Sequence, residues 1–176
     1  NRPNIRLTMP TVVITEDAGV TQIIAPTGTI LSGVNNPVEL RIKNFAQDTL
    51  KKVHIAWTLD GVSQTSFLWN GLLAEQVSSN VITIGNVNVI PGSHSIKAWT
   101  ELPNDSTDEI PANDTLSGSF YACSSLLNGP YTIGSGGDFP TFTSALNSLL
   151  NCGVSGPVIF NVLSGTYNEQ MNIPEI

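Results

Sequence analysis

The densest group of residues that could do chemistry lies between Glu101 and Asp114. This segment holds no Lys or Arg, and its acidic residues are Glu101, Asp105, Asp108, Glu109 and Asp114. Carboxylate oxygens on a flexible loop are ligands that suit Ca²⁺. Their spacing does not fit the EF-hand pattern, however, and neighbouring acidic side chains often only solvate a long hairpin loop. The sequence therefore favours a plain acidic loop, with calcium binding as the alternative and no other metal or cofactor indicated.

The two histidines do not suggest a catalytic pair. His54 falls on the polar face of a predicted strand and His94 lies beside a turn, with no Ser or Cys arranged nearby as a nucleophile. We predict that both are surface residues. The glycine-rich segment Gly134–Asp138 lacks the Lys-Ser/Thr pair that contacts phosphate and metal in a phosphate-binding loop, so it predicts a structural turn. No residue is assigned a catalytic role, and the chain is predicted not to be an enzyme.

Two aromatic residues, Phe67 and Trp69, lie next to Asn70-Gly71 near the tip of a predicted hairpin. Aromatic side chains in such a place can stack on a sugar ring or contact a partner protein. Packing against the adjoining strand or the second domain is the favoured interpretation. Binding of a glycan or of another surface protein is the alternative.

The chain contains two cysteines, Cys123 and Cys152. Neither belongs to a Cys-x-x-Cys motif or a histidine cluster, which argues against zinc. A disulfide between them would close a loop of about 30 residues and stabilise the fold by about 3–4 kcal/mol. We predict this disulfide, which implies an oxidising compartment outside the cytoplasm. Two unrelated buried thiols are the alternative.

Composition excludes several functions for this chain of 176 residues. The net charge is −7, and the seven Lys and Arg are spread along the sequence, so no basic stripe can neutralise the phosphates of a nucleic acid. No apolar run is long enough to span a bilayer. Charged residues make up only 12% of the chain, and Ser, Thr and Asn take their place, as is common in secreted β proteins.

The elements that must position these residues are mostly short strands. In Val38–Lys43, apolar and charged residues alternate strictly, which predicts a strand with one buried face. The predicted strands, this one included, lie at 20–25, 38–43, 53–59, 62–68, 77–84, 94–100 and 115–121. No helical periodicity supplies crossovers for a parallel sheet, so residues 16–122 predict an antiparallel β-sandwich of immunoglobulin-like type. Its predicted core contains Leu40, Ile42, Val53, Ile55, Trp57, Ile96 and Phe120.

The pattern changes after residue 122. Apolar residues recur at spacings of three and four after Thr141, which is a suitable N-cap, and Gly153 is a suitable C-terminal stop. The apolar run at 157–163 predicts a buried strand, and 171–173 could begin another. At the other end, residues 1–15 form a leading segment with a β-like run at 11–15, which is either the end of a preceding unit or the first strand of this one.

Residues 16–122 resemble the CARDB type of immunoglobulin-like module, a cell-adhesion-related domain of secreted bacterial and archaeal proteins. Five stretches carry the resemblance in the right order: Asp17-Ala18-Gly19-Val20, Val38-Glu39-Leu40-Arg41-Ile42-Lys43-Asn44-Phe45, Trp57-Thr58-Leu59-Asp60-Gly61, the Pro91–Trp99 strand, and Asn113-Asp114-Thr115. The resemblance implies a non-catalytic module at the cell surface of a bacterial adhesin-like protein. Such a module acts as a spacer, or in adhesion by binding a glycan or protein.

Residues 131–176 resemble the N-terminal cap and first coil of a right-handed parallel β-helix of the pectin-lyase-like superfamily. The similarity lies in Gly137-Asp138-Phe139-Pro140-Thr141-Phe142 with the helix after it, and in Gly165-Thr166-Tyr167-Asn168-Glu169. The resemblance implies that residues 123–176 are the truncated start of a larger domain. The alternative function is then an accessory domain of a polysaccharide lyase or pectin-esterase-like enzyme with its catalytic residues beyond Ile176. An open β-helix end also predicts self-association of this chain.

Overall fold

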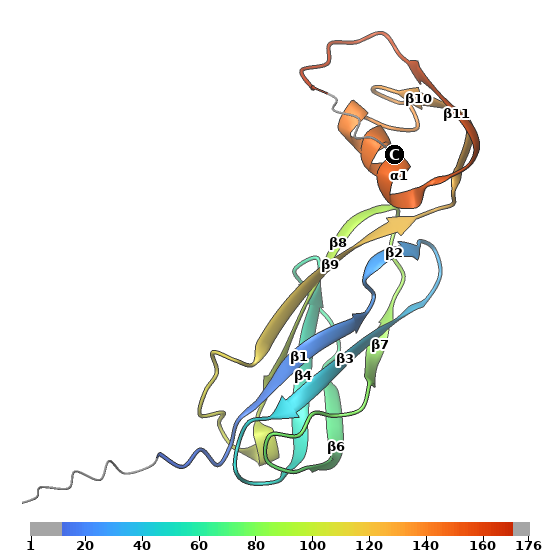
Figure 1. The fold of residues 1–176 in the computed structure, drawn as a ribbon. Coiled ribbons are helices and arrows are strands. Elements are labelled where there is room, and N and C mark those ends of the chain that lie inside the picture. The colour runs from blue at the N-terminus through green and yellow to red at the C-terminus, as the bar shows by residue number, and fades with distance from the viewer. Residues whose placement is uncertain (1–11, 171–176) are drawn as a thin grey trace, which may run out of the picture.

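The structure is a computed structural model that describes residues 12–170. Residues 18–123 form a sandwich of two β-sheets, and residues 127–162 form a smaller unit beyond one end of it (Figure 1). The smaller of the two sandwich sheets is antiparallel, and its strands lie in the order β1 (Ala18–Ala25), β3 (Asn36–Asn44), β7 (Ile82–Val87). No helix in the described part of the chain is long and apolar enough to cross a membrane.

The larger sheet contains six strands and is antiparallel apart from one parallel edge pair, β2 with β9. Along the sheet the order is β2 (Gly28–Leu31), β9 (Thr115–Cys123), β8 (Gly92–Glu101), β4 (Leu50–Leu59), β5 (Val62–Ser63), and β6 (Phe67–Leu73) also pairs with β4.

The core lies between the two sheets and contains all the predicted residues. Leu40 and Ile42 from the smaller sheet and Val53 and Ile55 from the larger sheet have no exposed surface, because the period-two pattern turns them inward. Trp57 is 3% exposed, and its indole Nε1 donates a hydrogen bond to the Thr65 carbonyl at 3.1 Å. The other two predicted core residues are also buried: Ile96 and Phe120.

Several strand boundaries differ from the prediction. The predicted strand 62–68 is split into β5 and β6, because Gln64 N–H and the Ser66 hydroxyl bond back to carbonyls of β4. The predicted strand at 77–84 begins later, at Ile82. Two strands, β2 and β10 (Leu127–Ile133), were not predicted, because neither shows apolar alternation and both contain glycine. Residues 12–15 are not a strand, and residues 1–11 and 171–176 lie outside the described residues.

The smaller unit is built around α1 (Phe142–Cys152), whose predicted ends are confirmed. The Thr141 hydroxyl accepts from Ser144 N–H at 3.0 Å, and the Ser144 hydroxyl faces Thr141 N–H at 3.2 Å. Gly153 ends the helix with a φ of 69°, a value that glycine adopts without strain. The strands on either side of α1, β10 and β11 (Val154–Val162), then pair in parallel.

A disulfide joins Cys123 to Cys152, as predicted. It connects the last residue of β9 to the last residue of α1, so it spans the short connector from the sandwich to the smaller unit. One hydrogen bond reinforces this junction: the Thr29 hydroxyl of the sandwich donates to the Asn151 carbonyl of the smaller unit at 3.0 Å.

Replacing Trp57 with alanine is expected to lower the free energy of unfolding by about 3–5 kcal/mol, because the change leaves a large cavity between the sheets. The matched control is Trp99→Ala, since the Trp99 side chain lies on the opposite face of the larger sheet and bonds to Glu101. That control should cost about 1 kcal/mol or less. Urea titrations followed by circular dichroism measure both, and equal losses would contradict the assigned core.

Thiol counting on denatured, unreduced protein should find no free cysteine. The double variant Cys123→Ser, Cys152→Ser should lose about 3–4 kcal/mol, since it frees a loop that the disulfide closes. Its effect should be confined to the melting of the smaller unit and its junction. Two titratable thiols in the parent protein would disprove the bond.

Candidate functional site

Three carboxylates come together at the end of the sandwich that is remote from the smaller unit. Asp17 directly precedes β1, Asp108 lies in the loop between β8 and β9, and Asp114 directly precedes β9. One side-chain oxygen from each lies within 4.8 Å of the others. Asp17 is 5% exposed and Asp114 is 7% exposed, whereas Asp108 is partly exposed. The cluster therefore draws on the first strand of one sheet and a central strand of the other.

The loop that carries Asp108 is fixed to the segment leading into β1. The loop follows the short helix η1 (Pro103–Asp105). Within it, the Glu109 carboxylate accepts hydrogen bonds from Thr15 N–H at 2.9 Å, from the Thr15 hydroxyl at 2.8 Å and from Glu16 N–H at 3.1 Å. These bonds lower the pKa of Glu109. Asp108 Oδ2 accepts from Ala18 N–H at 3.0 Å, and its Oδ1 from Ile110 N–H at 2.8 Å. The loop and the leading segment thus form one structure.

Three buried oxygens in this cluster have no hydrogen-bond donor. They are Oδ1 of Asp17, Oδ1 of Asn113 and Oδ1 of Asp114. The Asn113 amide donates to the other Asp17 oxygen at 3.3 Å, and Val20 N–H donates to the Asp114 carbonyl at 3.1 Å, so both residues are held facing the cluster. Buried polar atoms are nearly always satisfied in folded proteins. The Asn113 Oδ1 atom is an acceptor, and so are both carboxylate oxygens when they are ionised, so a donor or a cation would satisfy them.

The electrostatics of the cluster are unfavourable when all three groups are ionised. Burial, and then the charges of Asp108 and Asp17, raise the pKa of Asp114 to about 7. Burial is also the main cause that raises the pKa of Asp17, and its bond from Asn113 offsets only part of this rise. No Lys, Arg or His forms an ion pair with these carboxylates among the described residues.

The raised pKa of Asp114 makes the stability of the fold depend on pH in a definite direction. The folded state prefers the protonated carboxyl, and its pKa is about 7 against an ordinary value of 3.8. Without a bound cation, the contribution of Asp114 to stability is therefore highest below pH 3.8 and is lost as the pH rises towards 7.

The structure divides the predicted acidic set. Asp108 and Asp114 belong to the cluster, and Glu109 positions the loop. The other two lie elsewhere: Glu101 accepts from the Trp99 indole at 2.6 Å, and Asp105 pairs with Lys52. Sequence reasoning missed Asp17 because it is about ninety residues away, although it is the first residue of the stretch that resembles a CARDB opening.

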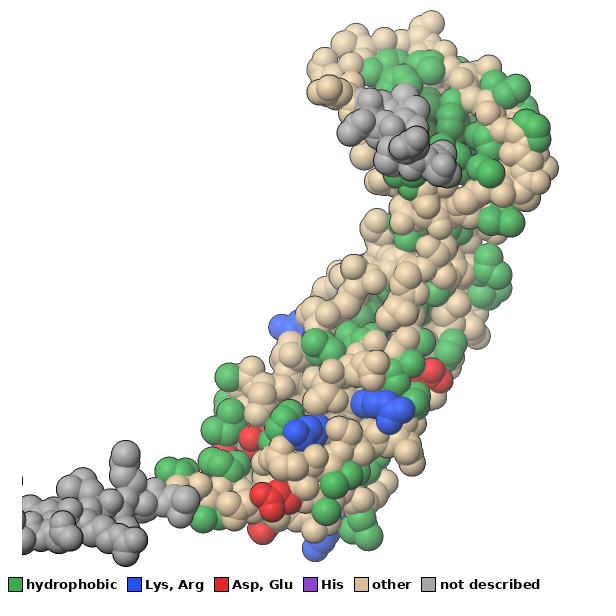
Figure 2. Space-filling view, in the orientation of Figure 1, with side chains coloured by type: hydrophobic (Ala, Val, Ile, Leu, Met, Phe, Trp, Pro, Cys, Tyr) green, Lys and Arg blue, Asp and Glu red, His purple; other side chains and the backbone are tan. Residues whose placement is uncertain are grey.

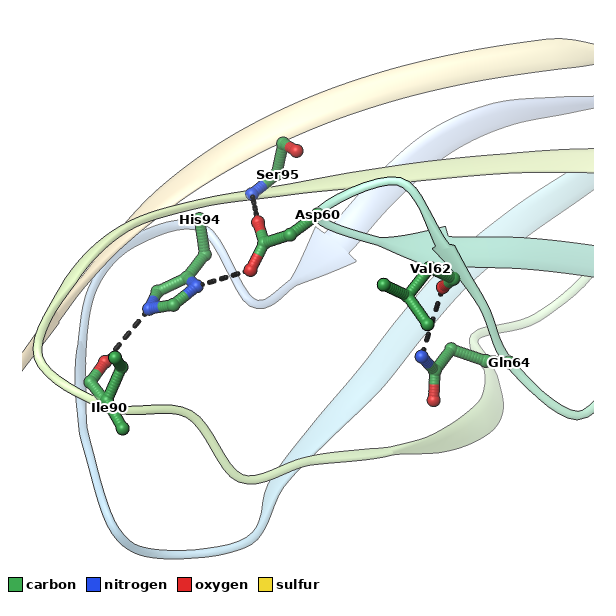
Figure 3. Close-up of polar contacts among 6 residues, drawn as sticks. All are labelled: Asp60, Val62, Gln64, Ile90, His94 and Ser95. Atoms are coloured by element: carbon green, nitrogen blue, oxygen red, sulfur yellow. Dashed lines mark hydrogen bonds and ion pairs between the residues drawn. The ribbon is translucent and has the colours of Figure 1, made fainter.

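The prediction of a surface role for His94 is wrong, because its side chain is only 9% exposed. The ring stacks on Phe120, and its two nitrogens face Asp60 Oδ2 at 2.7 Å and the Ile90 carbonyl at 2.8 Å (Figure 3). Asp60 also accepts from Ser95 N–H at 2.8 Å, so this group fastens the turn after β4 to the start of β8. Burial raises the pKa of Asp60, but the bonds from His94 and Ser95 outweigh it and lower the pKa overall. His54 is partly buried on β4.

The aromatic pair Phe67 and Trp69 lies on β6, and both side chains are partly buried against the sandwich core. An added Cβ at Gly71 would lie 2.4 Å from the Trp69 ring, so the indole covers the backbone there. This placement agrees with the packing interpretation, and stacking on a ligand stays a prediction.

The segment Gly134–Asp138 forms a turn that its own carboxylate closes. Asp138 Oδ2 accepts from Thr132 N–H at 2.8 Å and from Thr132 Oγ1 at 2.7 Å, and these bonds lower the pKa of Asp138. A negative carboxylate at this position opposes phosphate binding, as the structural-turn interpretation requires.

An open hollow of about 700 Å³ lies beside the loop. No His or Cys lines it among the described residues. The residues that line it are Glu16, Asp48, Thr49, Lys51, Lys52, Asn70 and Asn104.

No family model matches the chain, and no curated protein matches it in sequence. Solved structures do match. A domain of a candidate cell surface protein from Methanosarcina acetivorans is 14% identical, with a TM-score of 0.50 over 62% of this chain and 93% of that chain. The CARDB domain of a Pyrococcus furiosus protein, solved in complex with di-metal ions, is 13% identical, with a TM-score of 0.49 over 64% and 97%. At 14% identity, the likeness to the Methanosarcina domain shows the fold alone.

Proposed function

We propose that this chain is a non-catalytic module of an extracellular or cell-surface protein, in which the sandwich acts as a spacer between neighbouring parts. The observation that carries this proposal is the arrangement of its two ends. The chain enters the sandwich at one end and leaves at the opposite end, where β9 leads into the smaller unit (Figure 1). The Cys123–Cys152 disulfide and the Thr29–Asn151 hydrogen bond then join the two parts.

The surface supports this proposal. Lys and Arg are few and scattered on the face drawn in Figure 2, where backbone and side chains other than hydrophobic and charged ones cover most of the surface. The disulfide suits an oxidising compartment outside the cytoplasm. The fold shared with a domain of a candidate cell surface protein is consistent with the same location.

The proposal extends to residues 127–170, which begin a parallel β-helix. Strands β10 and β11 pair in parallel, with α1 between them in sequence. The Tyr167 hydroxyl donates to the Leu163 carbonyl at 2.8 Å, and Glu169 accepts from Thr143 N–H at 2.9 Å at the start of α1. The turn after β11 therefore closes back over the helix, as the first coil of a stack would. The self-association expected of an open coil end stays a prediction.

Adhesion through a glycan or a protein partner is the finer form of this function. The alternative is an accessory domain of a carbohydrate-active enzyme, with catalytic residues in further coils. A glycan array probed with the longer protein that contains these coils distinguishes the two, when it is combined with assays on the same polymers. Binding without turnover favours adhesion, and turnover favours the enzyme.

A rigid junction is the measurable requirement of a spacer. Small-angle X-ray scattering of the parent chain should fit one elongated shape, whereas the double variant Cys123→Ser, Cys152→Ser should give a broader distribution of dimensions. Circular dichroism of the variant checks that the sandwich is still folded. Identical scattering of a folded variant and the parent would argue against a junction that depends on the disulfide.

On pectin-like polymers, this chain should show no lyase or esterase activity above a buffer control. The reason is that the carboxylates of Glu109, Asp138 and Glu169, which each contact a threonine hydroxyl, also accept the backbone N–H of the same threonine, so they hold loops in place. Turnover that disappears when one of the chain's own carboxylates is changed to an amide would overturn the proposal.

A further inference from the structure

The cluster at the remote end of the sandwich has the composition of a cation site. We propose that Asp17, Asp108 and Asp114, together with the amide oxygen of Asn113, bind one Ca²⁺ ion. The ion would lock the loop between β8 and β9 onto the start of β1. This inference stands apart from the spacer function, because it rests on side-chain geometry alone.

The clearest evidence is the set of unpartnered oxygens, and not the acidity of the loop. Asp17 and Asp114 are 95% and 93% buried, from exposures of 5% and 7%, and each has an unsatisfied Oδ1 on a carboxylate that contributes an oxygen to the cluster. The Asn113 Oδ1 atom is a third buried acceptor without a donor. These atoms come from two strand starts in different sheets, so a chance grouping of neighbouring surface acids does not explain them.

The separation of the oxygens fits one ion. Ca²⁺ lies about 2.3–2.6 Å from its oxygen ligands, so ligands on opposite sides of the ion are about 5 Å apart. The carboxylate oxygens here lie within 4.8 Å of one another. Each Asp108 oxygen accepts one backbone N–H and keeps a second lone pair, which leaves Asp108 able to contact the ion while its position stays fixed.

The ligand type selects the metal. All the contributing atoms are oxygens, and no His or Cys belongs to the cluster, which disfavours zinc. Mg²⁺ demands a tight octahedron at about 2.0–2.1 Å and keeps several waters. Ca²⁺ accepts irregular sets of carboxylate and amide oxygens, so it fits best.

Binding would add a link between parts of the fold that hydrogen bonds already join. Asp17 precedes a strand of the smaller sheet, whereas Asn113 and Asp114 precede a strand of the larger sheet. An ion shared between them would act at one end of β9 as the disulfide acts at the other. The loop 106–114 and the segment before β1 should therefore become more ordered when Ca²⁺ binds.

The test uses the whole chain after treatment with EDTA and dialysis. Isothermal titration with CaCl₂ should show one ion per chain with a Kd of about 10⁻⁶–10⁻³ M, and MgCl₂ should bind at least about tenfold more weakly. Calcium should also raise the melting temperature and slow amide exchange at Ala18 and in 108–114. No heat, no thermal shift and no added protection at 10 mM CaCl₂, about ten times the weakest expected Kd, would overturn the proposal.

A matched pair of variants separates binding from folding. Asp114→Asn should weaken Ca²⁺ binding by at least about tenfold. In EDTA at pH 8, the same variant should melt at or above the temperature of the parent, because it removes a repelled buried charge. Asp105→Asn is the control: its carboxylate pairs with Lys52 outside the cluster, so it should bind Ca²⁺ like the parent. Equal affinities in Asp114→Asn and the parent would place the ion elsewhere and overturn the assignment.

Discussion

The burial of apolar side chains between the two sheets is the interaction on which the rest of the structure depends. No disulfide crosses the sandwich, since the chain's two cysteines are bonded to each other at the junction. The sheets are therefore held by packing, with Leu40 and Ile42 facing Val53, Ile55 and Trp57. An added Cβ at Gly85 would lie 2.8 Å from the Trp57 ring, so the glycine makes room for the large side chain between the sheets. This packing sets the positions of the strand ends, where the cluster and the junction lie.

Strand β9 connects the acidic cluster at one end of the sandwich to the junction at the other. Its pairing with β8 runs from Trp99–Thr115 to Gly92–Ala122, so nearly its whole length is fixed by backbone hydrogen bonds. The acidic cluster lies directly before its first residue, and Cys123 is its last. A shift of this strand would thus move both ends together, because one continuous strand carries them. The smaller unit is joined to β9 by the chain and by the Cys123–Cys152 disulfide, and to β2 by the Thr29–Asn151 hydrogen bond.

The sequence predicted what is encoded by periodicity and by local chemistry. Alternation placed the core residues of β3 and β4, and the Thr141 cap with Gly153 placed both ends of α1. Strand β2 was missed because it is a short edge strand, whose pairing with β9 depends on residues about ninety positions away. The same limit applies to the cluster. The acidic residues of the loop are visible in the sequence, but only the folded structure brings Asp17 next to them. His94 was misjudged because a residue beside a turn can still be covered, here by contact with Phe120.

The energetic cost of the cluster explains why a cation is the natural complement. Burying an ionised carboxylate costs several kcal/mol, whereas a whole domain is stable by only about 5–15 kcal/mol. One proton removes a single charge from three neighbouring carboxylates and leaves the remaining oxygens without donors. Water can supply donors but does not cancel the repulsion among Asp17, Asp108 and Asp114. A divalent cation does both at once: it satisfies the orphan oxygens directly and reduces a charge of three to one, at the place where the two sheets and the loop meet.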